Sequence, residues 1–187
     1  ISNSQLDEAI DRVMAGPQRK SRLMSEEERR VTAYHEAGHA LVAHALPHTD
    51  PVHKITIMPR GRALGYTMVL PDDDKYSTTR NQLLDQLAYS LGGRPAEKLI
   101  IHDPSTGASN DIEKATALAR AMVTQYGMTE AIGAIKLGAD SSAPFMGRDY
   151  GHQRDYSENL AAVVDAEIRK LIEKAHHEAY EILEANR

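Results

Sequence analysis

The chain has 187 residues, enough for one domain with a substantial core. Its net charge of −5 offers no broad basic surface, so we expect no nucleic-acid partner. The chain contains no cysteine, which excludes disulfides and thiolate metal sites, and any metal must be held by histidine and carboxylate. No apolar run approaches the roughly 18 residues of a membrane span. Because the first residue is Ile1 rather than methionine, we expect a piece of a longer protein.

The N-terminal residues predict a short helix and a linker. Three apolar residues recur at helical spacing within residues 1–15, namely Leu6, Ile10 and Val13. Gly16 and Pro17 end this pattern, and residues 18–22 are polar and basic. We therefore expect residues 1–24 to be a linker and residues 25–187 to form the folded domain.

The second predicted helix carries the most informative motif. Ser25 is followed three positions later by glutamate, which is a capping box, and Pro47 should end the helix. Between them, His35 and His39 are one turn apart and can direct two imidazoles at one cation, for which zinc is suited. Glu36 follows His35 and could take a proton from a water molecule that the metal activates. The alternative is a solvent-facing helix with two histidines by chance, but the helical context favours a metal-dependent hydrolase.

Other residues of this helix predict its packing. We expect the core stripe to consist of apolar residues at helical spacing, namely Val31, Tyr34, Leu41 and Ala45. Ala37, Gly38 and Ala40 are small and should let a neighbouring element approach closely.

The segment that follows predicts a β-hairpin and then a broken helix. Residues 55–58 and 64–70 are rich in β-formers, and residues 59–62 between them suit a turn. Residues 77–79 should cap a helix with leucines at helical spacing, and Gly92-Gly93-Arg94-Pro95 should kink or break it. Glu97 lies where we expect the helix to resume.

The C-terminal half predicts two more helices. A turn-rich loop over residues 104–111 should lead into a helix that stops at Gly127. Residues 129–156 lack a pattern and predict a surface loop, and a long helix should start near Ser157. The fold class predicted is therefore mainly α with a small β-sheet and a long C-terminal helix.

The spacing alone leaves the third metal ligand open. Asp111 follows a loop in which Gly107 could adopt a positive φ and Ser109 or Asn110 could cap the next helix, which would fix its side chain. Its alternative role is to complement the helix dipole. Glu97 reaches further, and it could be a ligand, an exposed acid, or a hydrogen-bond partner of a ligand.

Several blocks of sequence, spread over nearly the whole chain, are similar to the peptidase domain of the FtsH family. This family consists of membrane-anchored, ATP-dependent zinc proteases with an AAA+ ATPase module. The blocks are residues 9–17, Ala33-Tyr34-His35-Glu36-Ala37-Gly38-His39-Ala40, Met58-Pro59-Arg60-Gly61, Leu64-Gly65-Tyr66, Gly92-Gly93-Arg94, residues 106–112 and residues 122–128.

The resemblance implies roles for individual residues. It implies a zincin-like helical metallopeptidase domain that binds one zinc ion per chain through His35, His39 and Asp111, with Glu36 as catalytic base. Glu97 matches an acid near the site that is not a ligand. Pro95 departs from the small residue usual in the family at that position.

The resemblance also implies the setting of the domain. It implies a homo-hexamer that cleaves unfolded or membrane proteins, with ATP hydrolysed in a module absent from these residues. An N-terminal anchor, also absent, would hold the peptidase domain on the cytoplasmic, matrix or stromal side, whereas this fragment itself would be soluble. The chain would stop before the last C-terminal helices of the family.

The sequence also predicts where a substrate binds, and it leaves two alternative functions to be weighed. An extended substrate could add as a strand along Leu64, Gly65 and Tyr66. One rival is a ring-forming scaffold that does not cut, against which the intact Glu36 argues. The other is an unrelated zincin acting on small peptides.

Overall fold

The computed structural model describes residues 2–18, 24–60, 64–71, 74–138 and 156–187. In chain order, its elements are α1 (Asn3–Ala15), α2 (Glu26–Ala45), β1 (Val52–Thr56), β2 (Tyr66–Val69), α3 (Arg80–Leu91), α4 (Gly93–Ile100), a 3-10 turn η1 (Thr106–Ala108), α5 (Ser109–Thr124) and α6 (Glu158–Ala185). The predicted fold class, mainly α with a small sheet and a long last helix, is confirmed.

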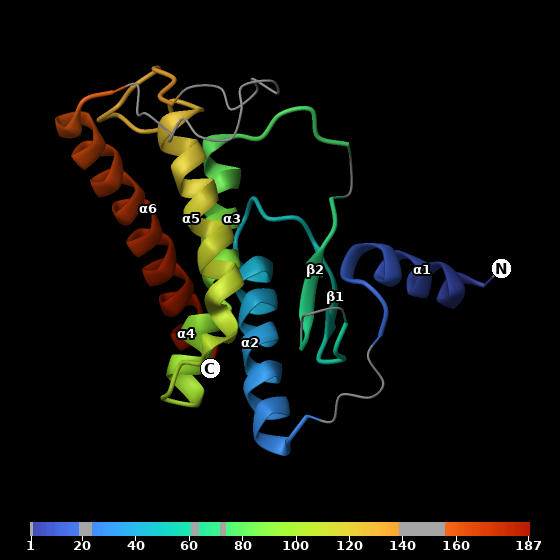
Figure 1. The fold of residues 1–187 in the computed structure, drawn as a ribbon. Helices are drawn as coiled ribbons and strands as arrows, with labels where there is room; N and C mark the ends of the chain where they lie inside the picture. Colours follow the sequence, from blue (N-terminus) through green and yellow to red (C-terminus); the bar gives the residue numbers. More distant parts are fainter. Residues whose placement is uncertain (1, 19–23, 61–63, 72–73, 139–155) are drawn as a thin grey trace, which may run out of the picture.

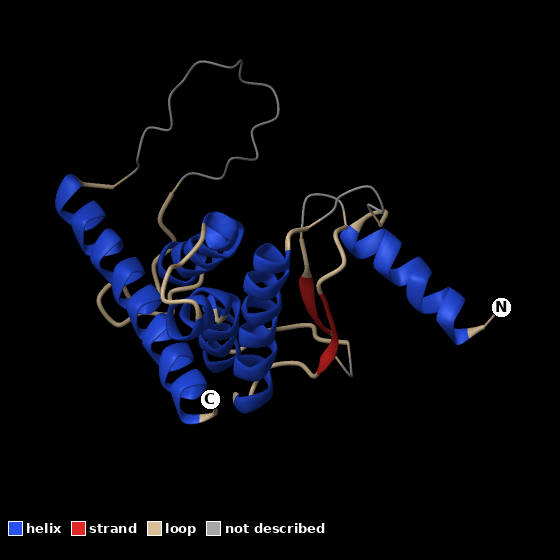
Figure 2. Cartoon of the chain, turned by 90° about the horizontal axis from the view of Figure 1, so that it is seen from below, coloured by secondary structure: helices blue, strands red, loops and turns tan. Residues whose placement is uncertain are grey.

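The helices form a bundle with the hairpin on one side. Helix α2 packs against α3 and α4, and α3 packs against α5 and α6. Figures 1 and 2 show the two strands beside α2, on the side of the bundle away from α6. A continuous apolar core joins the helices; its fully buried members include Val42, Leu87, Ala88, Ala119, Met122 and Val123.

Helix α2 begins as predicted but buries a different face. The Ser25 side chain accepts a hydrogen bond from the Glu28 amide at 3.1 Å, so the capping box is confirmed. The predicted core stripe is mostly wrong: Leu41 packs against the core, but Tyr34 and Ala45 are exposed and Val31 is only half-buried. The buried face carries Thr32, His35, Glu36, Gly38, His39, Ala40, Val42 and Ala43. Three of its polar side chains, His35, Glu36 and His39, have hydrogen-bond partners from other elements, and apolar periodicity alone does not reveal such partners.

The break after α3 lies where the glycines predicted it. Helix α3 ends at Leu91, and α4 begins at Gly93 and continues past Pro95, which is tolerated because amides of a first turn have no helical acceptor. A Cβ added to Gly38 would lie 2.6 Å from the Gly92 carbonyl oxygen. The small residue on α2 therefore permits the close approach that was expected, and it brings α2 directly onto the α3–α4 junction.

The predicted hairpin is confirmed, although its first strand starts and ends earlier in the sequence. Strands β1 and β2 pair antiparallel, with Thr56 opposite Tyr66 and Lys54 opposite Met68. The register shifts between Val52 and Lys54. Residues 61 and 62 of the predicted turn lie outside the described residues.

The C-terminal helix is confirmed, with Ser157 as its N-cap and seven buried residues along one stripe: Ala161, Val164, Ile168, Leu171, Ala175, Ala179 and Leu183. Residues 129–138 are turns and irregular backbone, and residues 139–155 of the predicted loop lie outside the described residues. Among the helices of the described residues, none is both long enough and apolar enough to cross a membrane.

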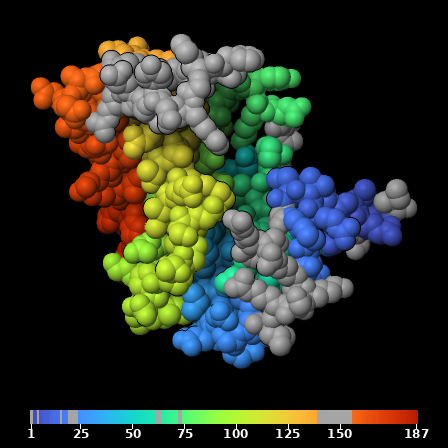
Figure 3. Space-filling view, in the orientation of Figure 1, coloured from blue at the N-terminus to red at the C-terminus, as the bar shows by residue number. Residues whose placement is uncertain are grey.

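Helix α1 projects from the bundle (Figure 3), and its apolar residues Leu6, Ile10 and Val13 are exposed. Val13 is 84% exposed, whereas Asp11 is buried and forms ion pairs with Lys54 and Arg60 of the hairpin segment. Arg60 also pairs with Glu8 at 2.7 Å. Ion pairs, rather than the amphipathic stripe, therefore attach α1.

Candidate metal centre

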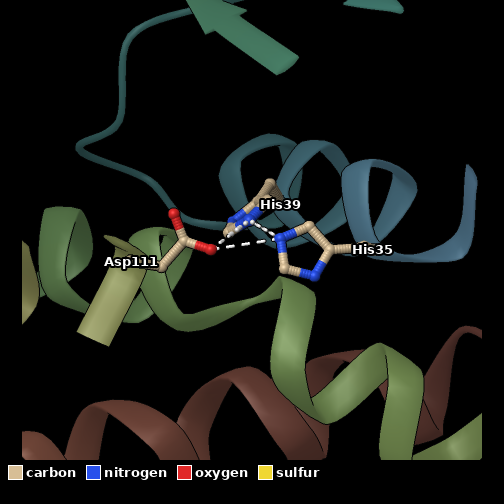
Figure 4. Close-up of side chains that lie close together, drawn as sticks. All are labelled: His35, His39 and Asp111. Carbon is tan, nitrogen blue, oxygen red and sulfur yellow. Dashed lines mark hydrogen bonds and ion pairs between the residues drawn. The ribbon is translucent and has the colours of Figure 1, made fainter. Parts of the chain in front are cut away.

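Three side-chain atoms from two helices converge at one point (Figure 4). His35 and His39 extend from α2, and Asp111 extends from the first turn of α5. The distance from His35 Nε2 to His39 Nε2 is 3.1 Å, and Asp111 Oδ2 lies 3.1 and 3.3 Å from these two nitrogens. Ligands about 2.0–2.1 Å from a tetrahedral zinc ion lie about 3.3 Å apart. The triangle of donor atoms therefore has the size of one face of a zinc tetrahedron.

The other ring nitrogens fix the histidine tautomers. His35 Nδ1 lies 2.7 Å from Glu97 Oε1, and His39 Nδ1 lies 2.7 Å from the Tyr89 carbonyl oxygen. Both partners only accept hydrogen bonds, so both Nδ1 atoms carry a hydrogen and donate it. In the neutral rings, the two Nε2 lone pairs then face each other and the Asp111 carboxylate. Such a cluster of acceptors fits a cation at its centre.

The ionisation of the cluster agrees with this geometry. Burial lowers the pKa of His35, but Asp111 and Glu97 outweigh burial, and the net pKa is raised. Burial raises the pKa of Asp111, but its hydrogen bonds with His35 and His39 outweigh that effect and hold the pKa well below its ordinary value. Positive charge beside the Asp111 and Glu97 carboxylates is thus favoured at His35, and a metal ion would supply it.

Glu97 connects the cluster to the loop that precedes α5. Its side chain is 1% exposed, and besides His35 it accepts a hydrogen bond from the Ser105 amide at 2.5 Å. A buried carboxylate needs such partners, because desolvation without them is costly. Of the roles left open for Glu97, the hydrogen-bond partner of a ligand is the one that this geometry fits.

The start of α5 is built differently from the sequence expectation. Gly107 lies in the 3-10 turn and is not one of the described glycines that have a positive φ. The side chain of Ser105 caps that turn. No side-chain cap precedes α5, whose N-cap position is Ala108. The expectation of a positive φ at Gly107 and a cap at Ser109 or Asn110 is therefore wrong. The turn continues directly into α5 and needs neither.

Glu36 lies beside the metal cluster and is bound by the hairpin. Burial raises the pKa of its carboxyl group, as suits a base that works near neutral pH. Thr67 of β2 contacts it through its hydroxyl, which lies 2.9 Å from Glu36 Oε2. Glu36, on α2, is therefore also held by the hairpin.

These residues open into one large cleft of about 1370 Å³. Its lining includes the metal cluster, Glu36, and the predicted strand residues Leu64, Gly65 and Tyr66. A Cβ added to Gly65 would lie 2.6 Å from the Thr56 carbonyl oxygen and 3.0 Å from Glu36 Cγ. The close approach that Gly65 permits is therefore to β1 and to Glu36 itself.

Some site residues gave no signal in the sequence. Tyr89 acts through its backbone carbonyl, which any residue would supply. Thr67 is one of several threonines, and no motif distinguishes it from the others. Both are brought to the cluster by long-range packing. His48 also has a close carboxylate partner, Asp85 at 3.0 Å, but it does not belong to the cluster.

Comparisons with known proteins agree on one group. A family model described as peptidase family M41 matches residues 22–187. The ATP-dependent zinc metalloprotease FtsH of Cutibacterium acnes (strain SK137) is 66% identical over 187 residues, covering 100% of this chain and 26% of that protein. FtsH 1 of Thermoanaerobacter sp. (strain X514) is 53% identical over 186 residues, covering 100% of this chain and 30% of that protein. FtsH of Rubrobacter xylanophilus is 54% identical over 187 residues, covering 100% and 29%. The chain thus spans between a quarter and a third of these relatives.

Proposed function

The chain belongs to peptidase family M41, and from this premise we propose that residues 25–187 act as a zinc-dependent endopeptidase domain. The observation that carries the proposal is the triangle of donor atoms from His35, His39 and Asp111, with edges of 3.1–3.3 Å, beside the buried Glu36. Relatives that carry the name zinc metalloprotease support zinc as the cation.

Each residue has a distinct task in this proposal. His35, His39 and Asp111 hold the metal, which supplies Lewis-acid activation of water and of the scissile carbonyl when it is bound. Glu36 takes a proton from the attacking water and returns it to the leaving amine, so that its carboxylate is regenerated. Glu97 keeps the His35 ring in the orientation and tautomer that metal binding needs.

The substrate is an extended polypeptide that lies along Leu64, Gly65 and Tyr66. This segment lines the cleft next to Glu36. In the two-stranded sheet, one edge of β2 pairs with β1, and the other edge pairs with no strand of the described residues. A peptide could add to the other edge through main-chain hydrogen bonds, which would accept many sequences. Unfolded proteins would supply such segments, whereas folded ones would not.

The domain would work inside a longer protein. We propose that residues 1–24 connect it to an ATPase module, that the full-length protein is a membrane-anchored hexamer, and that the peptidase domain lies on the cytoplasmic, matrix or stromal side. The share of the relatives that this chain spans supports a longer protein, and the words ATP-dependent in their names support an ATPase module.

Metal removal tests the proposed activity. The chain is stripped with a chelator, and cleavage of denatured casein is measured before and after zinc is restored, with zinc per chain determined by elemental analysis. We expect cleavage to vanish on stripping and to return at one zinc per chain. His44→Ala is the control, because His44 is exposed on α2, whereas His39→Ala should abolish both readouts. Undiminished cleavage by the stripped chain would refute the assignment.

A further inference from the structure

The Thr67 hydroxyl lies against the carboxylate of Glu36. Thr67 Oγ1 is 2.9 Å from Glu36 Oε2 and 2.9 Å from the Glu36 main-chain carbonyl oxygen. Thr67 belongs to β2 and lines the same cleft as the metal cluster. Thr67 therefore connects the strand beside the proposed substrate path to the proposed base.

The hydrogen bond distinguishes the two carboxylate oxygens. A hydroxyl has one hydrogen to donate, and a charged carboxylate is a stronger acceptor than a carbonyl that lies within a helix. Oε2 is thus the natural recipient. The described residues give Oε1 no hydrogen bond, which leaves that oxygen available to a water molecule.

A second contact restricts the same side chain. Gly65, two residues before Thr67, leaves so little space that a Cβ there would lie 3.0 Å from Glu36 Cγ. A glutamate has three rotatable side-chain bonds, and ordering it costs conformational entropy. The packing at Cγ and the hydrogen bond at Oε2 together hold the carboxylate in one orientation before substrate arrives.

We propose that Thr67 is a positioning residue for peptide hydrolysis, whose hydroxyl holds Glu36 Oε2 so that Oε1 exchanges the proton with the attacking water. This inference rests on the proposed role of Glu36 as general base. The proton moves from water to Oε1 and then to the leaving amine, while Oε2 keeps its hydrogen bond from Thr67 throughout. The hairpin thereby aligns the base as well as offering an edge to the substrate.

Two variants separate the hydroxyl from the shape of the side chain. Thr67→Val keeps the branched shape and suits a strand, whereas Thr67→Ser keeps the hydroxyl. Thr124→Val is a matched control, because Thr124 is also buried and donates to a backbone carbonyl at 2.9 Å, at the far end of α5 from Asp111. Zinc affinity is measured by competition with a chelator, and kcat and KM with an internally quenched peptide.

We expect Thr67→Val to bind zinc as tightly as the parent and to keep its KM within about twofold. Its kcat should fall about tenfold, a part of the roughly 10²–10⁴-fold that a general base contributes. Thr67→Ser should recover most of that loss, and Thr124→Val should leave all three values unchanged. In a Glu36→Gln background, Thr67→Val should cause no further loss, because the group that it positions is gone.

A binding measurement keeps the test decisive if turnover by the chain is slow. The probe is a peptide hydroxamate, which places a hydrogen-bonding group against the base when it binds zinc, and its Kd is measured by calorimetry. We expect about tenfold weaker binding in Thr67→Val and parental binding in Thr67→Ser. An unchanged kcat or hydroxamate Kd in Thr67→Val, or an equal loss in the Glu36→Gln background, would overturn the role of Thr67. If Glu36→Gln alone matched the parent in cleavage, the proposed function itself would fail.

Discussion

The two histidines of the metal cluster are oriented by different kinds of acceptor. The His35 ring donates to the side chain of Glu97, whereas the His39 ring donates to the backbone carbonyl of Tyr89. A backbone acceptor persists when its side chain is changed, so the orientation of His39 tolerates substitution at position 89. The orientation of His35 depends on one buried carboxylate, and mutations can therefore weaken the site through Glu97.

The first prediction concerns Glu36. Glu36→Gln has the same size and leaves all three donor atoms in place, but an amide cannot take a proton from water. We expect one zinc per chain by elemental analysis and a loss of casein cleavage of about 10²–10⁴-fold. Near-parental turnover in the zinc-loaded variant would contradict the role of Glu36.

The second prediction compares two carboxylates. Asp111→Ala removes one of three donors, so most zinc should be lost on dialysis, whereas Glu97→Gln keeps all three. Because Glu97 orients His35, its loss should weaken zinc affinity or activity by about 10–100-fold. Zinc per chain in both variants decides the matter. If Asp111→Ala kept one zinc per chain and Glu97→Gln kept none, Glu97 rather than Asp111 would be the third ligand.

At the scale of elements, α1 is attached to the hairpin segment by charge. Asp11 is buried against Lys54 and Arg60, whereas Leu6, Ile10 and Val13 face outward. The attachment should therefore respond to pH more strongly than the apolar bundle does.

The third prediction gives the sign of that pH response. The hydrogen bond from Lys54 lowers the pKa of Asp11 below its ordinary 3.8, against the effect of burial. A lowered pKa stabilises the docked helix above 3.8, and the stabilisation is lost as pH falls through the folded value. Hydrogen exchange of α1, compared with that of α6, should rise selectively below that pH. In Asp11→Asn, α1 should exchange fast at every pH; persistent protection there would show that another contact attaches the helix.

The fourth prediction concerns the α3–α4 junction. A Cβ at Gly93 would overlap the His35 ring, so Gly93→Ala must displace one donor of the cluster. We expect zinc affinity to fall about 10–100-fold, as for other losses of ligand orientation, with the helical content unchanged. Lys98→Ala, on the exposed side of α4, is the control. Parental zinc affinity in Gly93→Ala would show that the ring has another position that binds metal.

The features that could be predicted from the sequence are those that depend on residues close together in the chain. Ser25 and Ser157 marked helix starts because capping depends on residues within one turn, and Gly92-Gly93 marked the break for the same reason. The buried face of α2 and the outward face of α1 were not predictable from periodicity, because distant polar partners determine them. The cluster divides in the same way. His35, Glu36 and His39 form a local motif, but the spacing left Asp111 and Glu97 open because both reach the cluster through long-range packing.

At the scale of the whole molecule, the cleft lies where α2, α4, the start of α5 and the hairpin meet. His35 and Asp111, 76 positions apart in the chain, contact each other there. The site therefore exists only when the bundle is closed, and its metal should stabilise the folded state in turn. In the proposed function, the residues that hold the metal and move the proton all lie within this fold.

The last prediction separates cleavage from unfolding. The 187 residues contain no G-x-x-x-x-G-K phosphate-binding loop, and we therefore expect ATP to have no effect on cleavage by this chain. We expect the zinc-loaded chain to cut denatured casein slowly, to leave a stably folded protein intact, and to show the same rates with and without ATP and magnesium. Gel-based degradation assays with the folded and the denatured form of one substrate measure this directly. Stimulation of either rate by ATP would place nucleotide binding within these residues, and rapid cleavage of the folded form would mean that the cleft admits more than extended chains.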